Sequence, residues 1–470
     1  MKKLGNLKPE RVFYYFEEIC SIPHGSGNTK EISDFCVNFA KEHNLEYVRD
    51  DMGNVIIKKP ATKGKENRPT VIIQGHLDMV CEKDPEIDFD FEKQGLDISV
   101  DGDFIKANGT TLGGDDGIAV AMALAVLEDK NIIHPALEVL FTVDEETGMY
   151  GAKALDGSLL EGRTLINIDS EEEGVFTVSC AGGVRAEITL PVEYETNTKE
   201  CLKITVGGLI GGHSGVEIHK GRLNSNKVAA EFLNTLNDIN LVKINGGLKD
   251  NAIPVFTEIV IATNEDISEK AEEFRVNARC DTDKGLTITV EKCEKATKCF
   301  TRQSTQKSID LLNALPNGII KWSEDIENLV ETSLNMGVLT TDSNKITASF
   351  ALRSSVNSEK DKLVDILYKC AKAFGASLLR EGDYPAWEYK KDSILRDTMC
   401  RVWENIYGNK PEVIAIHAGL ECGLLSEKLP GLDSVSIGPD MIDIHTPREK
   451  ISISSVSRTY NFLYKLLKVL

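Results

Sequence analysis

The sequence predicts an α/β domain with a mainly parallel sheet covered by helices, interrupted by an inserted α+β domain. Three observations lead to this fold class: the chain length, a series of apolar β-branched runs that alternate with helices, and a change of character after about residue 185. With 470 residues, 41% of them apolar, the chain exceeds what one hydrophobic core usually supports. We therefore expect two domains.

The first part of the chain supplies helices and strands in alternation. Apolar residues recur at helical spacing in two segments, 9–20 and 29–43. Short β-branched runs and one strongly apolar helix follow, at 54–58, 70–74, 117–128, 137–143 and 164–168. Near-continuous apolar strands between helices are typical of a parallel sheet with both faces covered.

The middle of the chain is more polar, and its strands alternate between apolar and polar residues. A strand-helix-strand pattern occurs twice, which suggests a weak internal duplication. The first lies at 201–206, 223–236 and 258–262, and the second at 347–353, 359–374 and a following strand. The α/β character returns near residue 394, with a last helix at 454–469. We predict one domain formed by residues 1–186 and 383–470, and an inserted domain formed by residues 187–382.

Composition excludes several classes of partner and compartment. The net charge of −20, with no basic stripe, argues against nucleic acid. No secretory signal is readable at Met1 to Leu7, and the longest apolar run, Ile118 to Leu127, is too short for a bilayer, so no membrane partner is expected. The 11 cysteines form no CxxC pair, which favours reduced thiols in the cytoplasm.

His76 and Asp78 lie in the motif Gly75-His76-Leu77-Asp78, directly after a predicted strand. Side chains alternate along an extended chain, so both point the same way, and a carboxylate there can orient a metal-bound imidazole. A buried histidine with an aspartate partner is also an ordinary core feature. The position favours function, because open parallel sheets bind ligands beyond the carboxyl ends of their strands.

Acidic residues follow at two further places. In Gly113-Gly114-Asp115-Asp116-Gly117 an acidic pair begins a helix, and it is read either as simple capping or as one cap and one free ligand. In the segment 144–148, DEETG, three acidic residues end an apolar strand, which is unfavourable unless solvent or a cation relieves their repulsion. A solvated acidic turn is the alternative.

Asp169 and His445 complete the pattern, the first again after a β-rich run and the second in the segment 442–449. Several strands and a helix start thus bring histidine or carboxylate to one sheet edge. Histidines mixed with carboxylates suit a binuclear site of borderline metal better than calcium, which takes only oxygen, or structural zinc, which favours thiolates.

The order of these motifs, GHLD, GGDDG, DEETG, IDSEEEG and IDIHTPRE, resembles the dinuclear zinc peptidase family that includes glutamate carboxypeptidase, tripeptidase and acylase enzymes. Two more motifs, GHSGVEIH at 212–219 and IHAGLECG at 416–423, resemble its aminoacyl-histidine dipeptidase branch, and the resemblance covers nearly the whole chain. It implies a zinc-exopeptidase-like catalytic domain, with the inserted domain as a lid.

The resemblance also implies roles for the motif residues. Asp115 would bridge two metal ions, one completed by His76 and Asp169 and the other by Glu146 and His445. Asp78 would orient a histidine, Glu145 would be the general base for a metal-bridged hydroxide, and the Asp115–Asp116 peptide would be cis.

Residues of the lid would bind the substrate. His213 matches the histidine that donates to the oxyanion, often across a homodimer formed by the lids. Arg353 matches the arginine that holds a substrate carboxylate. His417 and Glu421 fit the branch motif and would line the site, while His219 has no assigned role. His213 as a turn cap, His219 as a surface residue and Arg353 as an ion-pair partner are the alternatives.

We therefore expect two divalent ions per chain, with zinc favoured over cobalt or manganese, and hydrolysis of short peptides, mainly dipeptides. Deacylation of N-acyl amino acids and carboxypeptidase action are alternatives, because relatives with the same ligands do both. A non-catalytic metal-binding scaffold is a third, but it would not need Glu145. No GxSxG and no HExxH motif occurs, which disfavours a serine hydrolase and a mononuclear zincin.

Overall fold

The computed structural model describes residues 3–278 and 280–470. These residues form two compact units. Unit 1 comprises Met1–Ser179, Tyr389–Ala415 and Glu421–Leu470, and unit 2 comprises Cys180–Glu388 and Ile416–Leu420. The short segment 416–420, which carries part of the IHAGLECG motif, thus belongs to the inserted unit.

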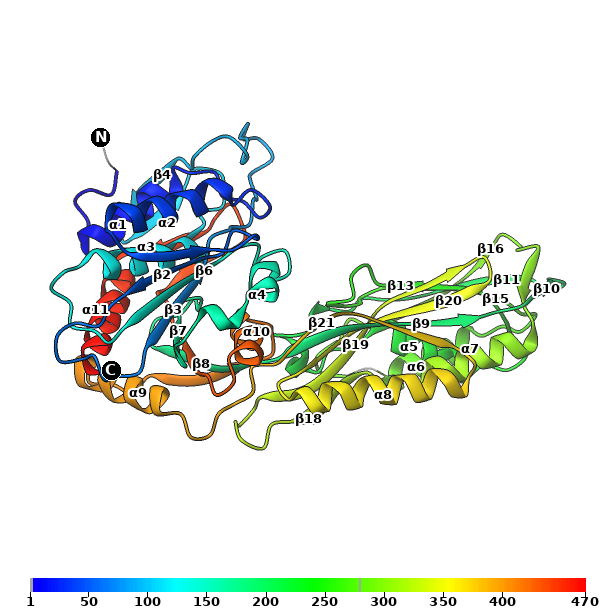
Figure 1. The fold of residues 1–470 in the computed structure, drawn as a ribbon. Helices are drawn as coiled ribbons and strands as arrows, with labels where there is room; N and C mark the ends of the chain where they lie inside the picture. The colour runs from blue at the N-terminus through cyan, green and yellow to red at the C-terminus, as the bar shows by residue number, and fades with distance from the viewer. Residues whose placement is uncertain (1–2, 279) are drawn as a thin grey trace. The chain divides into compact units, whose positions relative to one another are not determined.

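Unit 1 contains an eight-stranded sheet in the order β1-β2-β6-β3-β7-β23-β8-β22 (Figure 1). Its four central strands, β6, β3, β7 and β23, run parallel, whereas β1, β2 and β8 pair antiparallel toward the edges. The predicted α/β class is confirmed, and the sheet is mixed, because the flanking strands return without a crossover helix. The strand bounds are β1 Glu46–Arg49, β2 Val55–Lys59, β3 Val71–His76, β6 Leu137–Thr142, β7 Thr164–Asn167, β8 Val175–Cys180, β22 Glu412–Ile416 and β23 Asp433–Ser436.

Helices of unit 1 cover this sheet. The helix α3 (Gly114–Glu128) packs on β3 and on α1 (Glu10–Cys20), and it is buried on nearly all sides, as its apolar sequence requires. The helix α9 (Ile394–Tyr407) packs on β23 and on α11 (Ile453–Val469). The remaining elements are α2 Lys30–Glu42, α4 Tyr150–Ala154, α10 Glu421–Lys428 and the small sheet of β4 Ile98–Asp101, β5 Phe104–Ala107, β24 Met441–Ile442 and β25 Lys450–Ser452.

Unit 2 contains a nine-stranded sheet in the order β16-β11-β15-β13-β19-β20-β9-β21, with β18 paired to β19. Figure 1 shows α5, α6, α7 and α8 on one face of this sheet. Burial alternates along β20 because only that face is covered. The bounds are β9 Gly182–Pro191, β11 Cys201–Gly207, β13 Asn240–Gly246, β15 Thr257–Ala262, β16 Thr287–Cys293, β18 Gly318–Trp322, β19 Val330–Asp342, β20 Lys345–Ser354, β21 Ser377–Tyr384, α5 Ser225–Leu233, α6 Ser268–Ala278, α7 Arg302–Ala314 and α8 Asn357–Ala373.

Two short ladders complete unit 2. The strands β12 (Gly212–His213) and β14 (Ala252–Ile253) pair with each other, as do β10 (Tyr194–Thr196) and β17 (Lys298–Phe300). The strand expected after the second predicted helix is β21, which pairs with β9 rather than with β20. None of the helices in the described part of the chain has the length and apolar character that a membrane span requires.

Candidate active site

Three neighbouring parallel strands of unit 1 deliver histidine or carboxylate to one edge of the sheet. His76 is the last residue of β3, Glu145 and Glu146 follow β6, and Asp169 follows β7. The register aligns His76 with Thr142 and Gln74 with Asn167, so the three strands end within two residues of one another. The convergence predicted from the sequence is therefore present, because the carboxyl ends of neighbouring parallel strands lie at one edge of the sheet.

Asp115 lies between the two histidines. One carboxylate oxygen, Oδ1, is 3.1 Å from His76 Nε2, and the other, Oδ2, is 3.1 Å from His445 Nε2. Beyond the histidines, Asp169 Oδ1 is 3.7 Å from His76 Nε2, and Glu146 Oε1 is 2.9 Å from His445 Nε2. The five predicted ligands thus form one cluster, with a histidine and a second carboxylate on each side of Asp115.

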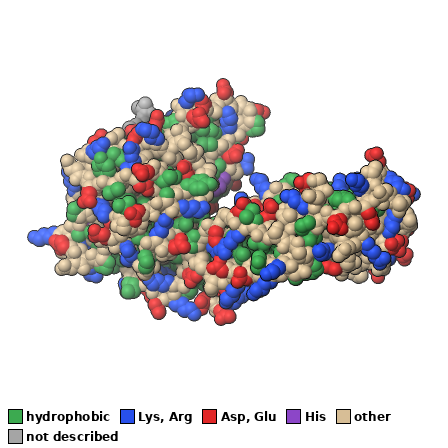
Figure 2. All heavy atoms as spheres, turned by 45° about the vertical axis from the view of Figure 1, so that its right-hand side comes forward, with side chains coloured by type: hydrophobic (Ala, Val, Ile, Leu, Met, Phe, Trp, Pro, Cys, Tyr) green, Lys and Arg blue, Asp and Glu red, His purple; other side chains and the backbone are tan. Residues whose placement is uncertain are grey.

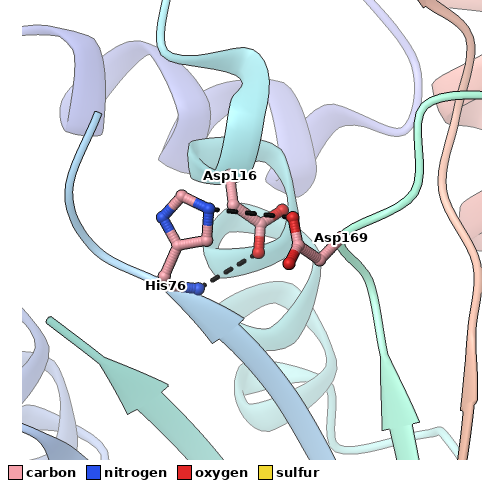
Figure 3. A group of neighbouring side chains, drawn as sticks. All are labelled: His76, Asp116 and Asp169. Carbon is pink, nitrogen blue, oxygen red and sulfur yellow. Dashed lines mark hydrogen bonds and ion pairs between the residues drawn. The ribbon is translucent and has the colours of Figure 1, made fainter. Parts of the chain in front are cut away.

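Asp116 is fully buried and supports this cluster from the next position in the chain (Figure 3). Its Oδ2 accepts a hydrogen bond of 3.1 Å from the backbone N–H of His76. The Asp115–Asp116 peptide is cis, as the resemblance implies. Neither aspartate side chain caps α3. The backbone at Asp115 and Asp116 is not helical, although both residues lie within the bounds of this helix. The capping alternative for this pair is therefore wrong, because both carboxylates are turned toward the histidines.

Asp78 does more than the sequence predicts. His76 Nδ1 lies 3.0 Å from the backbone carbonyl oxygen of Asp78 and 3.5 Å from its carboxylate. The carboxylate itself accepts hydrogen bonds from the backbone N–H groups of Glu145, at 2.9 Å, and Glu146, at 3.2 Å, and from the hydroxyl of Ser26. Asp78 therefore positions the loop that carries both glutamates as well as the histidine.

The crowding of carboxylates changes their protonation. Burial raises the pKa of Asp169 to about 6, and the neighbouring Asp115 and Glu146 add to the effect. Burial also raises the pKa of Glu145 well above its usual range, and the charges of Asp169, Glu421 and Glu146 raise it further. Conversely, the carboxylates of Asp115 and Glu146 raise the pKa of His445 to about 10. Such a concentration of negative charge attracts cations.

The donor set fits two metal ions. Within the described residues, three groups have ligand atoms within 4.8 Å of one another: His76 with Asp116 and Asp169, His76 with Glu145 and Glu146, and Asp115 with Glu146 and His445. Imidazole with carboxylate suits divalent ions of the zinc type. Asp116 already accepts the His76 N–H, so Asp115, with one oxygen toward each histidine, is better placed to bridge two ions.

A buried polar network beneath the cluster was not predicted in this form. The carboxylate of Glu421 is fully buried in unit 1, where Gln74 Nε2 and Thr142 Oγ1 both donate to its Oε2 at 2.6 Å. Asn167 Nδ2 in turn donates to Gln74 Oε1. The predicted substrate contact of Glu421 stays a prediction, and these bonds favour a supporting position. Gln74 and Asn167 could have been found as polar residues inside otherwise apolar strands.

The other predicted residues gather in unit 2 around Gly215. A Cβ added to Gly215 would lie 2.7 Å from the carbonyl oxygen of His417, 2.9 Å from His213 Cε1 and 3.0 Å from Arg353 Nε. Only a residue without a side chain fits there. The three side chains come from β12, from β20 and from the segment 416–420. His219 is exposed in the short 3-10 helix Ile218–Lys220, which follows β12.

His213 has a defined tautomer in this cluster. Its Nδ1 accepts hydrogen bonds of 3.2 Å from the backbone N–H groups of Gly215 and Val216. Burial lowers the pKa of His213, and Arg353 lowers it further, which favours the neutral ring. A neutral imidazole that accepts at Nδ1 carries its proton on Nε2. The turn-capping alternative is therefore present in the structure, and it leaves Nε2–H as a donor.

Arg353 and His417 each make one side-chain hydrogen bond. Arg353 Nη1 donates to the hydroxyl of Tyr384 at 3.2 Å, and His417 Nε2 lies 2.7 Å from Ser333 Oγ. Among the described residues, the buried Arg353 Nε has no hydrogen-bond partner, whereas the backbone of Val330 also acts on His417. Sequence reasoning missed Tyr384 and Ser333, because nothing in their local sequence marks them.

Comparison with known proteins agrees with this geometry. The profile of Peptidase family M20/M25/M40 matches residues 72–469. The chain belongs to this family. The cytosol non-specific dipeptidase of Escherichia coli K12 is 39% identical over 481 aligned residues, which cover 100% of this chain and 99% of the relative.

Solved structures of two other proteins are also similar to this chain. The crystal structure of aminoacylhistidine dipeptidase from Vibrio alginolyticus matches with a TM-score of 0.94 and 38% identity, over 99% of this chain and 98% of that one. The aminopeptidase PepT of Bacillus cereus matches with a TM-score of 0.58 and 18% identity, over 98% of each chain, which shows a shared fold. The family resemblance and the α/β fold expected from the motifs are thus confirmed.

Proposed function

We propose that this M20 family member is a dipeptidase that cleaves Xaa-His and other short unblocked peptides with two divalent metal ions, zinc being favoured. The names of the Escherichia coli and Vibrio relatives, both dipeptidases, support the substrate class. The first of these names also places its protein in the cytosol, and we propose the cytoplasm for this chain, whose 11 cysteines form no disulfide bond in the structure. In Figure 2, acidic and basic side chains are interspersed on the visible face.

The arrangement around Asp115 carries the proposal. Its two oxygens each face one histidine at 3.1 Å, and one further carboxylate stands beyond each histidine. On this proposal Asp115 would be shared by the two ions, His76 and Asp169 would complete one site, and Glu146 and His445 would complete the other. When bound, the ions supply Lewis acidity and a water nucleophile near neutral pH.

Glu145 is left to move the proton. Its backbone N–H is held by Asp78, and burial together with neighbouring carboxylates raises its pKa, which makes the carboxylate a better proton acceptor. We assign it as the general base that accepts the proton of the attacking water and delivers it to the leaving amine. A metal-binding scaffold would need no such uncoordinated carboxylate.

Residues of unit 2 would complete the site as a lid. His213, with its proton on Nε2, would donate to the oxyanion of the tetrahedral intermediate, either in its own subunit or in that of a homodimer partner formed through the lid. Arg353 would hold the substrate carboxylate with its planar set of donors. A clamp on the terminal carboxylate would favour short substrates, because it fixes the distance between that carboxylate and the cleaved bond.

A substrate panel tests this proposal. The chelated protein is reloaded with Zn²⁺, Co²⁺ or Mn²⁺ and assayed against dipeptides including β-alanyl-histidine, against tripeptides and against N-acyl amino acids. We expect metal-dependent turnover with the highest kcat/KM for dipeptides. A preference for N-acyl amino acids or longer peptides would instead support the deacylase or carboxypeptidase alternatives, and turnover that survives complete chelation would contradict the proposal.

A further inference from the structure

The carboxylate of Glu449 is buried at the start of α3 and accepts hydrogen bonds from four successive backbone N–H groups. Its Oε2 accepts from Leu112 at 2.8 Å and from Gly113 at 3.2 Å. Its Oε1 accepts from Gly114 at 2.8 Å and from Asp115 at 3.4 Å. Only 3% of Glu449 is exposed, so water does not compete for these bonds.

This carboxylate joins two loops that are far apart in the sequence. One loop ends at Asp115, and the other carries His445, four residues before Glu449. The second loop has an uncommon backbone, because Asp443 and His445 both adopt left-handed conformations, with φ of 55° and 59°. Such conformations persist where surrounding contacts impose them. Glu449 supplies contacts of this kind, because its hydrogen bonds connect the loop that carries His445 to the loop that ends at Asp115.

We propose that Glu449 is a positioning residue that sets the spacing between Asp115 and His445, and thereby the affinity of the metal site formed by Asp115, Glu146 and His445. This inference rests on the proposed function, which requires that site. Groups that orient metal ligands commonly contribute 10- to 100-fold to metal affinity or activity. The site formed by His76 and Asp169 depends on Glu449 less, because it shares only Asp115 with the anchored loops.

A second buried carboxylate offers a matched control. Glu138 is 2% exposed and accepts hydrogen bonds from the backbone N–H groups of Glu161 and Gly162, between 2.9 and 3.1 Å. It is the second residue of β6, and the carboxyl end of this strand leads to the metal cluster, so Glu138 lies at the opposite end. Removing its charge should cost stability without moving a metal ligand.

Metal titration of chelated protein distinguishes positioning from plain stabilisation. Zn²⁺ is titrated against a chromophoric chelator for wild type, Glu449→Gln and Glu138→Gln, and thermal unfolding of each metal-free protein is recorded. In Glu449→Gln one carboxylate oxygen becomes an amide NH2 group, which cannot accept from the two backbone N–H groups that it would face. We expect two ions for wild type and for Glu138→Gln, and for Glu449→Gln one ion bound normally and one bound about 10- to 100-fold more weakly.

Gly114→Ala is a second, milder variant that keeps the carboxylate. Its new Cβ would lie 3.3 Å from Glu449 Oε1 and 3.4 Å from Met441 Sδ, so the carboxylate must shift slightly. We expect a smaller loss at the same metal site, and this variant decides the matter if Glu449→Gln does not fold.

Two outcomes overturn the inference. If Glu449→Gln, or Gly114→Ala in its place, binds both ions as wild type does while stability falls as in Glu138→Gln, then Glu449 only stabilises the fold. If wild type itself binds fewer than two ions, the proposed dinuclear function fails, and the inference fails with it.

Discussion

The cluster of histidines and carboxylates in unit 1 and the cluster around Gly215 in unit 2 are assembled in different ways. In unit 1, His76, Glu146 and Asp169 follow buried parallel strands, whose carboxyl ends meet at one edge. Asp115, at the start of α3, and His445, in a loop, join them there. In unit 2, His213, Arg353 and His417 come from a short strand, a long strand and an isolated segment, and they meet through tertiary packing alone. The first arrangement follows from local sequence, and the second does not.

The roles differ accordingly. The unit 1 cluster is rich in carboxylates and fits cations, whereas the unit 2 cluster contains an arginine and two neutral histidines and fits the anionic parts of a substrate. The account predicts that substitutions in unit 1 affect metal binding or chemistry, and that substitutions in unit 2 affect substrate affinity or oxyanion stabilisation.

The largest expected effect belongs to Glu145. Glu145→Gln removes the proton acceptor but no proposed ligand, so turnover should fall by about 10²- to 10⁴-fold while two ions still bind. Metal content is measured beside kcat. The matched variant Glu146→Gln, at the adjacent position, should instead weaken metal binding. If Glu145→Gln loses metal and Glu146→Gln does not, the two roles have been exchanged.

His213→Ala should lower kcat by about 10²- to 10³-fold, because a donor to the oxyanion acts mainly in the transition state. Metal content should stay unchanged. His219→Ala is the control, since His219 is exposed on the same loop, and its kcat should equal that of wild type. Equal effects of the two variants on kcat would contradict the assignment of His213.

Tyr384→Phe tests the orientation of Arg353 and should act mainly on KM. Loss of the hydrogen bond from Arg353 Nη1 to the Tyr384 hydroxyl should raise KM by roughly tenfold or less, with kcat changed little. Tyr194→Phe, elsewhere in unit 2, serves as the control. A fall in kcat at unchanged KM would show that Tyr384 does not act through binding of the substrate carboxylate.

The smallest expected effect is a pH dependence of stability that arises from His417. Burial lowers the pKa of this histidine to about 3, helped by the nearby Arg353 and His213. Between this value and the unfolded pKa of about 6.5, the unfolded chain binds more protons, so stability falls as pH decreases, by at most about 1.4 kcal/mol per pH unit. Thermal unfolding of the metal-free protein between pH 6.5 and 5 should show a steeper loss for wild type than for His417→Gln; parallel curves would contradict this.

The same contrast explains how much the sequence could predict. Strand ends, buried apolar runs and acidic motifs locate His76, Glu146 and Asp169 at one edge, because strand periodicity and topology are local properties. The roles of Asp116 and Glu449 could not be predicted in this way, because their hydrogen-bond partners are backbone N–H groups. Which N–H groups a loop exposes is decided only in the folded chain.

In unit 2, resemblance to the family named His213 and Arg353, but no spacing pointed to Tyr384 or Ser333. Their contacts join segments 31 and 84 residues away in the sequence. The tautomer of His213 likewise follows from the fold of a turn rather than from its motif.

The central claim is that five residues hold two divalent ions with Asp115 between them. Anomalous X-ray diffraction at the zinc edge, on crystals of the zinc-loaded protein, tests this most directly. The account predicts two anomalous peaks, one in contact with His76 and Asp169, one in contact with Glu146 and His445, and both in contact with Asp115. A single peak, or a pair in which Asp116 replaces Asp115 as the shared ligand, would contradict it.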